Sequence, residues 1–162
     1  MPPSGESAAY PSLDALDRAI LRELQRDGRL TNVDLARRIG LSPSPCLRRV
    51  KALEERGYIT GYAAVLDPVR LGRSLQVVVM VSLIDQRQET LGAFEAAVAE
   101  LDDVVGAALI AGDADYLLTV RVRDLDSYHR LFTERLGELP GVVSLRSLVT
   151  MKAVKDTRSL PV

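Results

Sequence analysis

The sequence predicts an α+β protein in which a helix-turn-helix is followed by a ferredoxin-like domain. Three segments at the front of the chain carry apolar residues at helical spacing. A short turn containing Gly40 separates the second segment from the third, which is the connection expected in a helix-turn-helix. The rear half instead alternates strand-like and helix-like stretches in the order β-α-β-β-α-β, the ferredoxin-like arrangement.

Capping residues delimit the first two helices. Asp14 is the expected N-cap of the first helix, and Gly28 follows its last turn. Thr31 is the expected N-cap of the second helix, with Asp34 three residues later. Gly40 then supplies the left-handed position at the C-terminus of that helix. The apolar residues of the two helices are Leu16, Ile20, Leu21, Leu24, Leu35, Ala36 and Ile39.

The third helix is expected to begin at Ser42, whose hydroxyl would accept a hydrogen bond from the first turn. Pro43 and Pro45 fall within that turn, where a proline removes no intrahelical hydrogen bond. The two prolines stiffen the entry to the helix and fix its angle, and the helix is expected to stop before Gly57. The residues predicted to face the core are Leu47, Val50 and Leu53.

The opposite face of this third helix is polar and basic, with Arg49 beside it. Arg48 can form two hydrogen bonds with guanine O6 and N7, while Ser44 can bond a base edge or a phosphate. Solvent-facing cations on an amphipathic helix are the alternative interpretation. The capped helix pair, the basic face and the β-prone segment that follows together favour a surface that binds double-stranded DNA. The candidate DNA-binding residues are Ser42, Ser44, Pro45, Arg48, Arg49 and Lys51.

A change of pattern after Gly57 marks the end of the helical region. Residues 58–66 are β-prone, and we interpret them as a small wing or as a strand leading out of the first domain. The predicted organisation is a disordered N-terminus at 1–11, a winged helix-turn-helix at 12–66, a linker at 67–75 and a second domain at 76–162.

The second domain is expected to contain a four-stranded sheet and two helices. Its first strand is indicated by the β-branched run Val77-Val78-Val79-Met80-Val81, and Asp126 is the expected cap of its second helix. The predicted strands span 76–84, 104–110, 116–122 and 142–154, and the predicted helices span 89–101 and 126 to about 139.

Composition narrows the classes of function. Hydrophobic residues make up 47% of the chain and charged residues 27%, which excludes wholesale disorder. Cys46 and His129 are the only residues of their kinds, so we expect no internal disulfide, no Cys/His zinc site, no cofactor and no histidine-dependent enzyme. Cys46 is expected to be a small buried hydrophobe. A chain with one cysteine fits a reducing compartment, so the expected location is the cytoplasm. No apolar run approaches the roughly 18–20 residues that cross a bilayer.

Charge is distributed unevenly along the chain. Residues 12–61 contain ten basic and seven acidic residues, whereas residues 62–162 contain eleven basic and fourteen acidic residues. A modestly basic front half is compatible with a nucleic-acid surface of limited extent, and the acidic rear half is not.

Motifs in both halves of the chain resemble the leucine-responsive regulatory protein/AsnC (Lrp/AsnC) family, also called feast/famine regulators. The matching motifs include Leu41-Ser42-Pro43, Pro45-Cys46, Gly57-Tyr58-Ile59, Gly112-Asp113-Ala114-Asp115-Tyr116-Leu117-Leu118 and Leu139-Pro140-Gly141-Val142. They occur in the family's order from about Leu13 onward. The resemblance implies a transcriptional regulator whose winged helix-turn-helix is joined to an effector-binding RAM domain with ACT-like topology. It also implies homodimers formed through the sheet, octamers built from them, and an amino acid or related small molecule as effector.

The loop that joins the two middle strands is the candidate effector site. In the family resemblance this loop carries the ligand, and its candidate contacts here are Gly112, Asp113, Asp115 and Tyr116. Backbone amides near Gly112 would hold a ligand carboxylate while an aspartate pairs with the α-amino group. A plain hairpin turn, in which Gly and Asp are the usual residues, is the alternative for the loop. Sheet packing is an equal alternative for Tyr116.

Two other functions remain open at this point. One is an architectural role, in which oligomers wrap DNA with little sequence preference, and it uses the same residues as a local regulator. The other is an enzyme resembling the siroheme decarboxylases on this scaffold, which is disfavoured because His129 is the only histidine and has no supporting motif.

Overall fold

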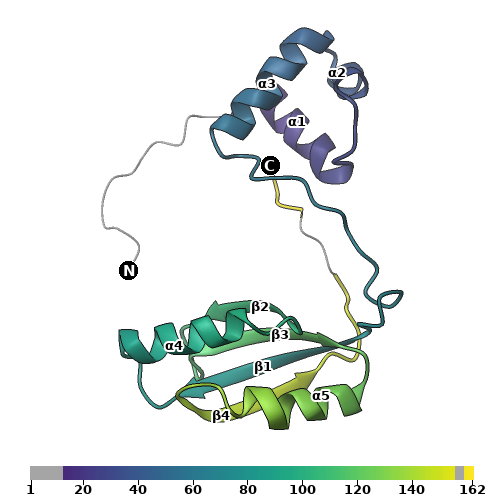
Figure 1. Ribbon diagram of the computed structural model, residues 1–162. Coiled ribbons are helices and arrows are strands. Elements are labelled where there is room, and N and C mark those ends of the chain that lie inside the picture. The colour runs from purple at the N-terminus through teal and green to yellow at the C-terminus, as the bar shows by residue number, and fades with distance from the viewer. Residues whose placement is uncertain (1–12, 156–158) are drawn as a thin grey trace. The chain divides into compact units, whose positions relative to one another are not determined.

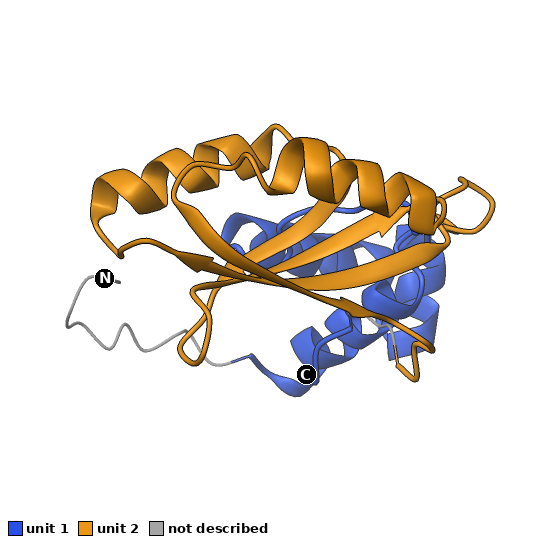
Figure 2. Cartoon of the chain, turned by 90° about the horizontal axis from the view of Figure 1, so that it is seen from below, with its two compact units in different colours: residues 1–65, 156–162 blue, residues 66–155 orange. Residues whose placement is uncertain are grey.

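The computed structural model describes residues 13–155 and 159–162 of the chain (Figure 1). The chain divides into two compact units, Met1–Val65 with Asp156–Val162 and Leu66–Lys155, which we call the helical unit and the sheet unit (Figure 2). Each unit has a hydrophobic core of its own. The predicted lead-in at 1–11 lies outside the described residues.

Three helices form the helical unit: α1 (Ala15–Arg26), α2 (Asn32–Ile39) and α3 (Pro43–Glu55). Each helix places an apolar side against the other two, and burial of this apolar surface is the main force that holds such short helices together. The buried residues of this core are Ile20, Leu21, Leu35, Ala36, Cys46 and Leu53.

The ends of α1 and α2 are fixed as the sequence predicts. The Asp14 carboxylate accepts a hydrogen bond from the Asp17 N–H at 2.8 Å, and the Thr31 hydroxyl accepts one from the Asp34 N–H at 3.1 Å. Gly40 ends α2 with φ 72°, a left-handed conformation that costs a residue with a Cβ more than it costs glycine. The helix-turn-helix between α2 and α3 is therefore confirmed.

The buried face of α3 differs by one residue from the predicted face. Leu47 is 44% exposed, whereas Cys46 is fully buried, and Leu53 completes the core stripe with the half-buried Val50. Seven residues, from Cys46 to Leu53, bring an α-helix back to within about 20° of the same direction. The six residues from Leu47 to Leu53 leave the two side chains roughly 120° apart at 3.6 residues per turn. Leu47 consequently points outward, and its prediction as a core residue is wrong.

The start of α3 is held differently from the prediction. Ser42 occupies the N-cap position, but its side chain makes no capping hydrogen bond. An N-cap side chain bonds the N–H of the second or third helical residue, and the third here is Pro45, which has none. The Asn32 side-chain amide instead donates to the Pro43 carbonyl at 2.7 Å and ties the start of α2 to the start of α3.

No strand is assigned between residues 58 and 66, so the predicted β segment there is wrong for this chain on its own. Gly57 ends α3 with φ 73°, and the Tyr58 N–H donates back to the Leu53 carbonyl at 2.9 Å. The segment beyond has β-prone side chains, but no strand in the described part of the chain pairs with its backbone groups.

The C-terminal residues belong to the helical unit, whereas the prediction placed them with the second domain. The Gln25 side chain holds Leu160 at both backbone groups, accepting from its N–H at 2.6 Å and donating to its carbonyl at 3.1 Å. Arg22 donates to the Val162 carbonyl at 3.1 Å, and the Val162 side chain packs against the helical core. The last four residues thus close over α1.

The sheet unit has the predicted β-α-β-β-α-β order. Its strands are β1 (Leu75–Leu83), β2 (Val104–Leu109), β3 (Tyr116–Val122) and β4 (Val142–Val149), and its helices are α4 (Gln88–Ala99), α5 (Leu125–Leu131) and the π-helical turn η1 (Phe132–Leu136). The strands pair antiparallel in the order β2-β3-β1-β4, which confirms the ferredoxin-like sheet. The last strand is shorter than predicted and ends at Val149.

Both helices of this unit cover one face of the sheet (Figure 2). Residues of β1 and β3 alternate between buried and half-buried, as expected when side chains point to opposite faces. The buried set, which includes Val79 and Leu118, packs against Phe94 of α4 and Leu131 of α5. Neither helix covers the other face of the sheet.

Candidate DNA-binding surface and effector loop

The outward face of α3 includes four exposed residues, Ser44, Leu47, Arg48 and Lys51, and the exposed Glu55 follows them at the end of the helix. Their spacing of three, four and seven residues places all four on one side of a helix. The buried Cys46 and Leu53 hold the other side in the core, so packing fixes the direction in which this face points. Ser44, Arg48 and Lys51 were expected on this face from the sequence, whereas Leu47 was expected in the core.

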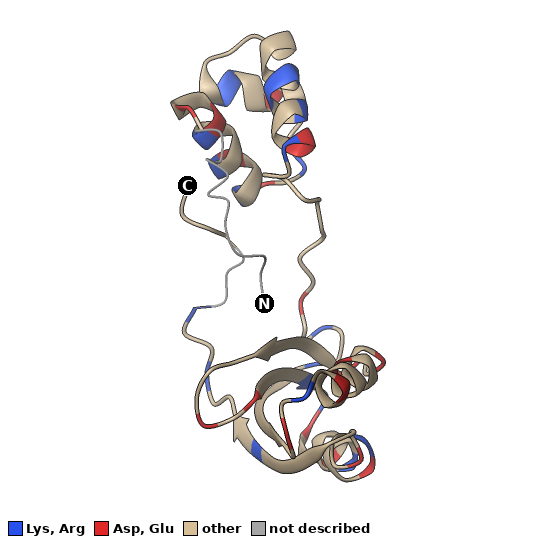
Figure 3. Cartoon of the chain, turned by 90° about the vertical axis from the view of Figure 1, so that its left-hand side faces the viewer, with Lys and Arg blue, Asp and Glu red and all other residues tan. Residues whose placement is uncertain are grey.

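Arg48 and Lys51 are basic residues whose side chains make no hydrogen bond or ion pair within the described residues. Figure 3 shows that basic and acidic residues are mixed on the helices of this unit. On α1 and α2 most of them neutralise one another. These ion pairs, at 2.9–3.0 Å, are Arg26–Glu23, Arg38–Glu23 and Arg37–Asp34. Positive charge therefore remains available on α3, where a polyanion can use it.

Arg49 has a different situation from its neighbour Arg48. Its guanidinium contacts the Asp14 carboxylate at 2.7 Å and the Asp17 carboxylate at 2.8 Å, and its side chain is about two-thirds buried. The hydrogen bonds that Arg49 donates to the Asp17 and Asp14 carboxylates raise the pKa of Arg49, which keeps it fully charged. Arg49 thus joins α3 to the start of α1. Its assignment to DNA stays a prediction, and its contacts here are structural.

Ser42 and Pro45, the other predicted contacts, lie at the start of α3. Ser42 is exposed, and its hydroxyl is free of the capping bond that was expected. Pro45 is half-buried in the first turn. The free N–H groups and positive dipole end of a helix start favour a phosphate at this position.

Asp115 in the loop between β2 and β3 is used to hold the loop in place. Its carboxylate accepts from the Leu83 N–H and from the Gln86 side chain, both at 2.7 Å. Its backbone N–H donates to the Val81 carbonyl at 2.9 Å, and its carbonyl accepts from Ile110 at 2.8 Å. Two of these bonds tie Asp115 to the end of β1, one ties it to Gln86 just beyond that strand, and the bond from Ile110 closes the loop itself. Little of Asp115 is left for a ligand.

Tyr116, the next predicted contact, is a core residue. Its ring lies 4.6 Å from the Phe94 ring, and its hydroxyl donates to the Glu95 carboxylate at 2.6 Å. Burial and this hydrogen bond raise the pKa of Tyr116 to about 12. Gly112 and Asp113, by contrast, are exposed, and the Asp113 side chain makes no hydrogen bond within the described residues. Only these two of the four predicted contacts are left open to a ligand.

Comparison with protein-family models accounts for both units. A model described as "Winged helix-turn-helix DNA-binding" matches residues 13–60, and one described as "Lrp/AsnC ligand binding domain" matches residues 76–160. The chain belongs to the Lrp/AsnC family. It is a DNA-binding transcriptional regulator of that type, and the family resemblance and the α+β fold class expected from the sequence are confirmed.

Curated relatives match this Lrp/AsnC chain over nearly its whole length. It is 47% identical over 148 residues to the leucine-responsive regulatory protein of Salmonella typhimurium, covering 91% of this chain and 90% of the relative. It is 46% identical to the leucine-responsive regulatory protein of Escherichia coli K12 over the same shares of each chain. These relatives are named as regulators rather than enzymes.

Solved structures show the same two-unit architecture. A transcriptional regulator of Neisseria meningitidis, in complex with L-Met, has a TM-score of 0.89 and 38% identity and covers 93% of this chain and 97% of its own. The feast or famine regulatory protein of Mycobacterium tuberculosis, complexed with L-methionine, has a TM-score of 0.79 and 32% identity, with 92% and 99% covered.

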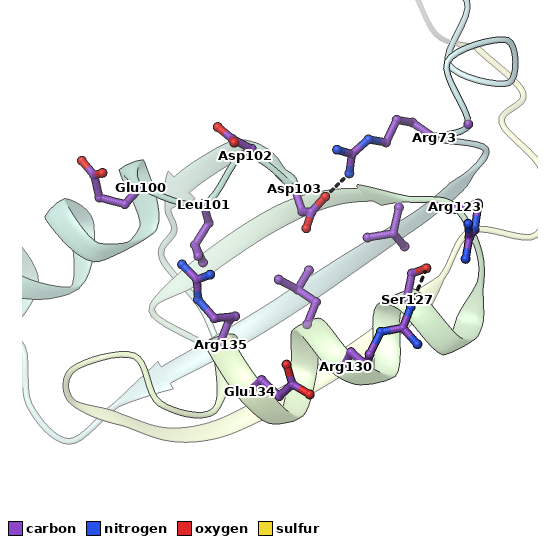
Figure 4. A pocket seen from close by; sticks show the side chains of 13 residues that line it. Arg73, Glu100, Leu101, Asp102, Asp103, Arg123, Ser127, Arg130, Glu134 and Arg135 are labelled. Atoms are coloured by element: carbon purple, nitrogen blue, oxygen red, sulfur yellow. Dashed lines mark hydrogen bonds and ion pairs between the residues drawn. The ribbon is translucent and has the colours of Figure 1, made fainter.

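An open groove of about 550 Å³ in the sheet unit was not foreseen from the sequence (Figure 4). Arginines and acidic residues line it in equal number, and several are paired: Arg73 binds Asp103, and Arg130 donates to the Ser127 hydroxyl at 3.4 Å. The groove therefore has no dominant charge that would select a ligand. Within the described residues no group of His, Cys, Asp and Glu is arranged to hold a metal ion, and no helix is long and apolar enough to cross a membrane.

Proposed function

We propose that this Lrp/AsnC regulator reads specific DNA sequences with the outward face of α3 and that an amino acid at the 112–115 loop modulates that binding. The proposal that α3 reads DNA rests on the exposure and the unpaired charge of Arg48 and Lys51 in the described part of the chain. They extend from a helix whose other side is locked in the core, and their side chains have no partner in the described residues. A helix positioned in this way enters the major groove with its outward side chains against base edges.

Arg48 is the principal reading residue of the proposal. A guanidinium can donate two parallel hydrogen bonds to guanine O6 and N7, the commonest specific contact in protein–DNA complexes. Ser44 lies one turn earlier and reaches a base edge or phosphate, while Lys51 and the exposed Ser42 and Pro45 lie along the same helix. The phosphate contacts supply affinity, and Arg48 supplies discrimination.

Replacing Arg48 tests the DNA-binding part directly. Arg48→Ala is expected to weaken binding to a selected duplex by about 1–3 kcal/mol, roughly 5- to 150-fold, at fixed salt. Arg26→Ala is the matched control, because Arg26 is an equally charged, exposed residue on α1 that pairs with Glu23. It is expected to change the affinity less than twofold. Equal effects of the two substitutions, or none from Arg48→Ala, would contradict the assignment.

The effector part rests on the open tip of the loop. Two structural neighbours are complexes with L-methionine, which makes an amino acid the chemical class to test here. With Asp115 tied to β1, Asp113 is the loop carboxylate free to pair with an α-amino group, and the backbone near Gly112 would hold the carboxylate. Asp115 and Tyr116 would mainly hold the loop in its conformation and contribute little direct binding to the ligand.

Thermal stability in the presence of free amino acids and branched-chain keto acids tests this part. A ligand that binds only the folded state raises the melting temperature, because it stabilises that state by RT ln(1 + L/Kd), where L is the free ligand concentration. We expect at least one amino acid to do so, and Asp113→Ala to remove the shift without changing the unliganded melting temperature by more than about 2 °C. A shift that persists in Asp113→Ala would assign the ligand to another place.

A homodimer formed through the uncovered face of the sheet is part of the proposal, with octamers as the larger assembly in the cytoplasm. That face carries Val78, Met80, Leu117 and Leu148, which lie opposite one another in the strand pairing, and Leu148 is 49% exposed. Two-fold pairing would present two α3 helices to a pseudo-palindromic site and double the base contacts. A monomer by light scattering at micromolar concentration would contradict this element.

A further inference from the structure

We infer that Leu47 is a specificity-determining residue that contacts the 5-methyl group of a thymine in the major groove. This inference rests on the proposed reading of DNA by α3 and names a second determinant on the same face. Leu47 is 44% exposed, and it is not needed for the core, because Cys46, Val50 and Leu53 fill the buried side of the helix.

The position of Leu47 on α3 is that of a base-reading residue. It follows Ser44 by three residues and precedes Lys51 by four, so it lies within the polar and basic outward face, next to Arg48. It also lies in the N-terminal half of α3, and the N-terminal residues of a recognition helix are the ones that meet base edges. A surface that brings Arg48 to a base therefore brings Leu47 to the same or an adjacent base pair.

The surroundings of Leu47 indicate what it contacts. An isolated exposed leucine is ordinary on a protein surface, and by itself it indicates nothing. Here Ser44 and Lys51 lie one turn away on either side and Arg48 is the next residue, and these polar and basic side chains are unsuited to an apolar protein partner but complementary to a polyanion. In the major groove of B-DNA the distinctive apolar group is the thymine 5-methyl, and apolar side chains recognise it there.

The thymine methyl can be removed from the DNA without changing its hydrogen bonds. Deoxyuridine keeps every donor and acceptor of thymidine and lacks only that methyl group. A duplex selected by the wild-type protein from a random pool would be made with each thymidine replaced singly by deoxyuridine. We expect one replacement per half-site to weaken wild-type binding about fourfold, the value that corresponds to burial of one methyl-sized group.

Combining these duplexes with Leu47 variants isolates the contact. In Leu47→Ala the same deoxyuridine replacement is expected to have no effect, whereas Leu47→Met, which keeps an apolar side chain of similar size, should retain most of it. Because Leu47 is exposed, neither variant is expected to alter the melting temperature appreciably. A replacement that weakens wild type and Leu47→Ala equally would overturn the inference, as would the absence of any sensitive thymidine.

Failure of the inference is distinguishable from failure of the proposed function. If the wild-type protein selects a defined sequence and Arg48→Ala weakens binding to it, the reading surface stands even when Leu47 shows no coupling to a thymine methyl. If the wild-type protein selects no sequence from the pool, both the proposed sequence-specific function and the inference are overturned.

Discussion

The outward face of α3 and the loop at 112–115 differ in whether their charged side chains already have bonding partners. On α3 the candidate DNA-binding side chains of Arg48 and Lys51 have no hydrogen-bond or ion-pair partner within the described residues. In the loop, the carboxylate of the candidate effector contact Asp115 already accepts hydrogen bonds from the Leu83 N–H and the Gln86 side chain. A family motif can therefore combine side chains that are open to a ligand with side chains that hold the local structure, and the hydrogen bonds of each side chain distinguish the two kinds.

The largest expected effect on stability comes from replacing Asp115, the aspartate that fastens the loop to β1. Asp115→Ala leaves the Leu83 N–H without its acceptor in a partly buried position and is expected to lower the free energy of unfolding by about 1–3 kcal/mol. Asp113→Ala is the matched control in the same loop, and its cost is expected to stay below about 0.5 kcal/mol. Denaturant unfolding of the full chain measures both. Equal losses of unfolding free energy in the two variants would show that Asp115 does not stabilise the loop.

The next effect concerns the end of the chain on α1. Deleting residues 159–162 removes the bonds from Gln25 and Arg22 and the packing of Val162. We expect a loss of about 1 kcal/mol in the stability of the helical unit, because the bonds are exposed and Val162 is only partly buried. Hydrogen–deuterium exchange of peptides from α1 would report it as faster exchange, and peptides from β1 and β3 serve as the internal control. Unchanged protection of α1 would show that the tail adds nothing.

A smaller effect separates the two adjacent arginines of α3. Arg49→Ala removes a partly screened bridge to Asp14 and Asp17 and is expected to cost roughly 0.5–1 kcal/mol of stability. Arg48→Ala is expected to cost almost none, although it weakens DNA binding much more. Comparison of the melting temperatures of the two variants checks this. If Arg48→Ala were the less stable variant, the division of roles on α3 would be wrong.

The smallest effect is on acid stability. A hydrogen bond from the Asp17 N–H, and the nearby Arg49, lower the pKa of Asp14 in the folded chain. A group with a lowered folded pKa contributes stability that is present above its ordinary pKa and lost as pH falls through the folded value. We therefore expect the melting temperature to decline below about pH 4, and Asp14→Asn to decline less steeply. An identical decline in that variant would exclude Asp14 as a contributor.

Residues that act within their own helix, such as caps, allowed the helices to be predicted from the sequence. Contacts between residues far apart in the sequence could not be predicted in this way. Thr31 and Gly40 act within one turn of their own helix, so their roles could be read from the sequence. The direction of Leu47 was also present in the sequence, since the seven-residue spacing from Cys46 to Leu53 favours Cys46 as the core residue. It was missed because leucine is the more hydrophobic of the two neighbours.

Other features of the chain have no local signature. The bond from Gln25 to Leu160 joins residues that are 135 positions apart, and the Asp115 carboxylate is held by Leu83 and Gln86, which precede it by 32 and 29 positions. The same holds for Arg49, which resembles Arg48 in sequence and differs only because α1 places Asp14 and Asp17 beside it. The candidate site could therefore be located from sequence, while the role of each residue within it required the structure.

The central claim, that α3 reads bases through Arg48, is tested most directly by the sequences that the protein selects. Wild-type protein and Arg48→Ala would each select duplexes from one random pool at one salt concentration. We expect the wild-type motif to contain a strongly preferred guanine in each half-site, and Arg48→Ala to lose that preference while retaining the other positions. An unchanged guanine preference in Arg48→Ala would contradict the claim.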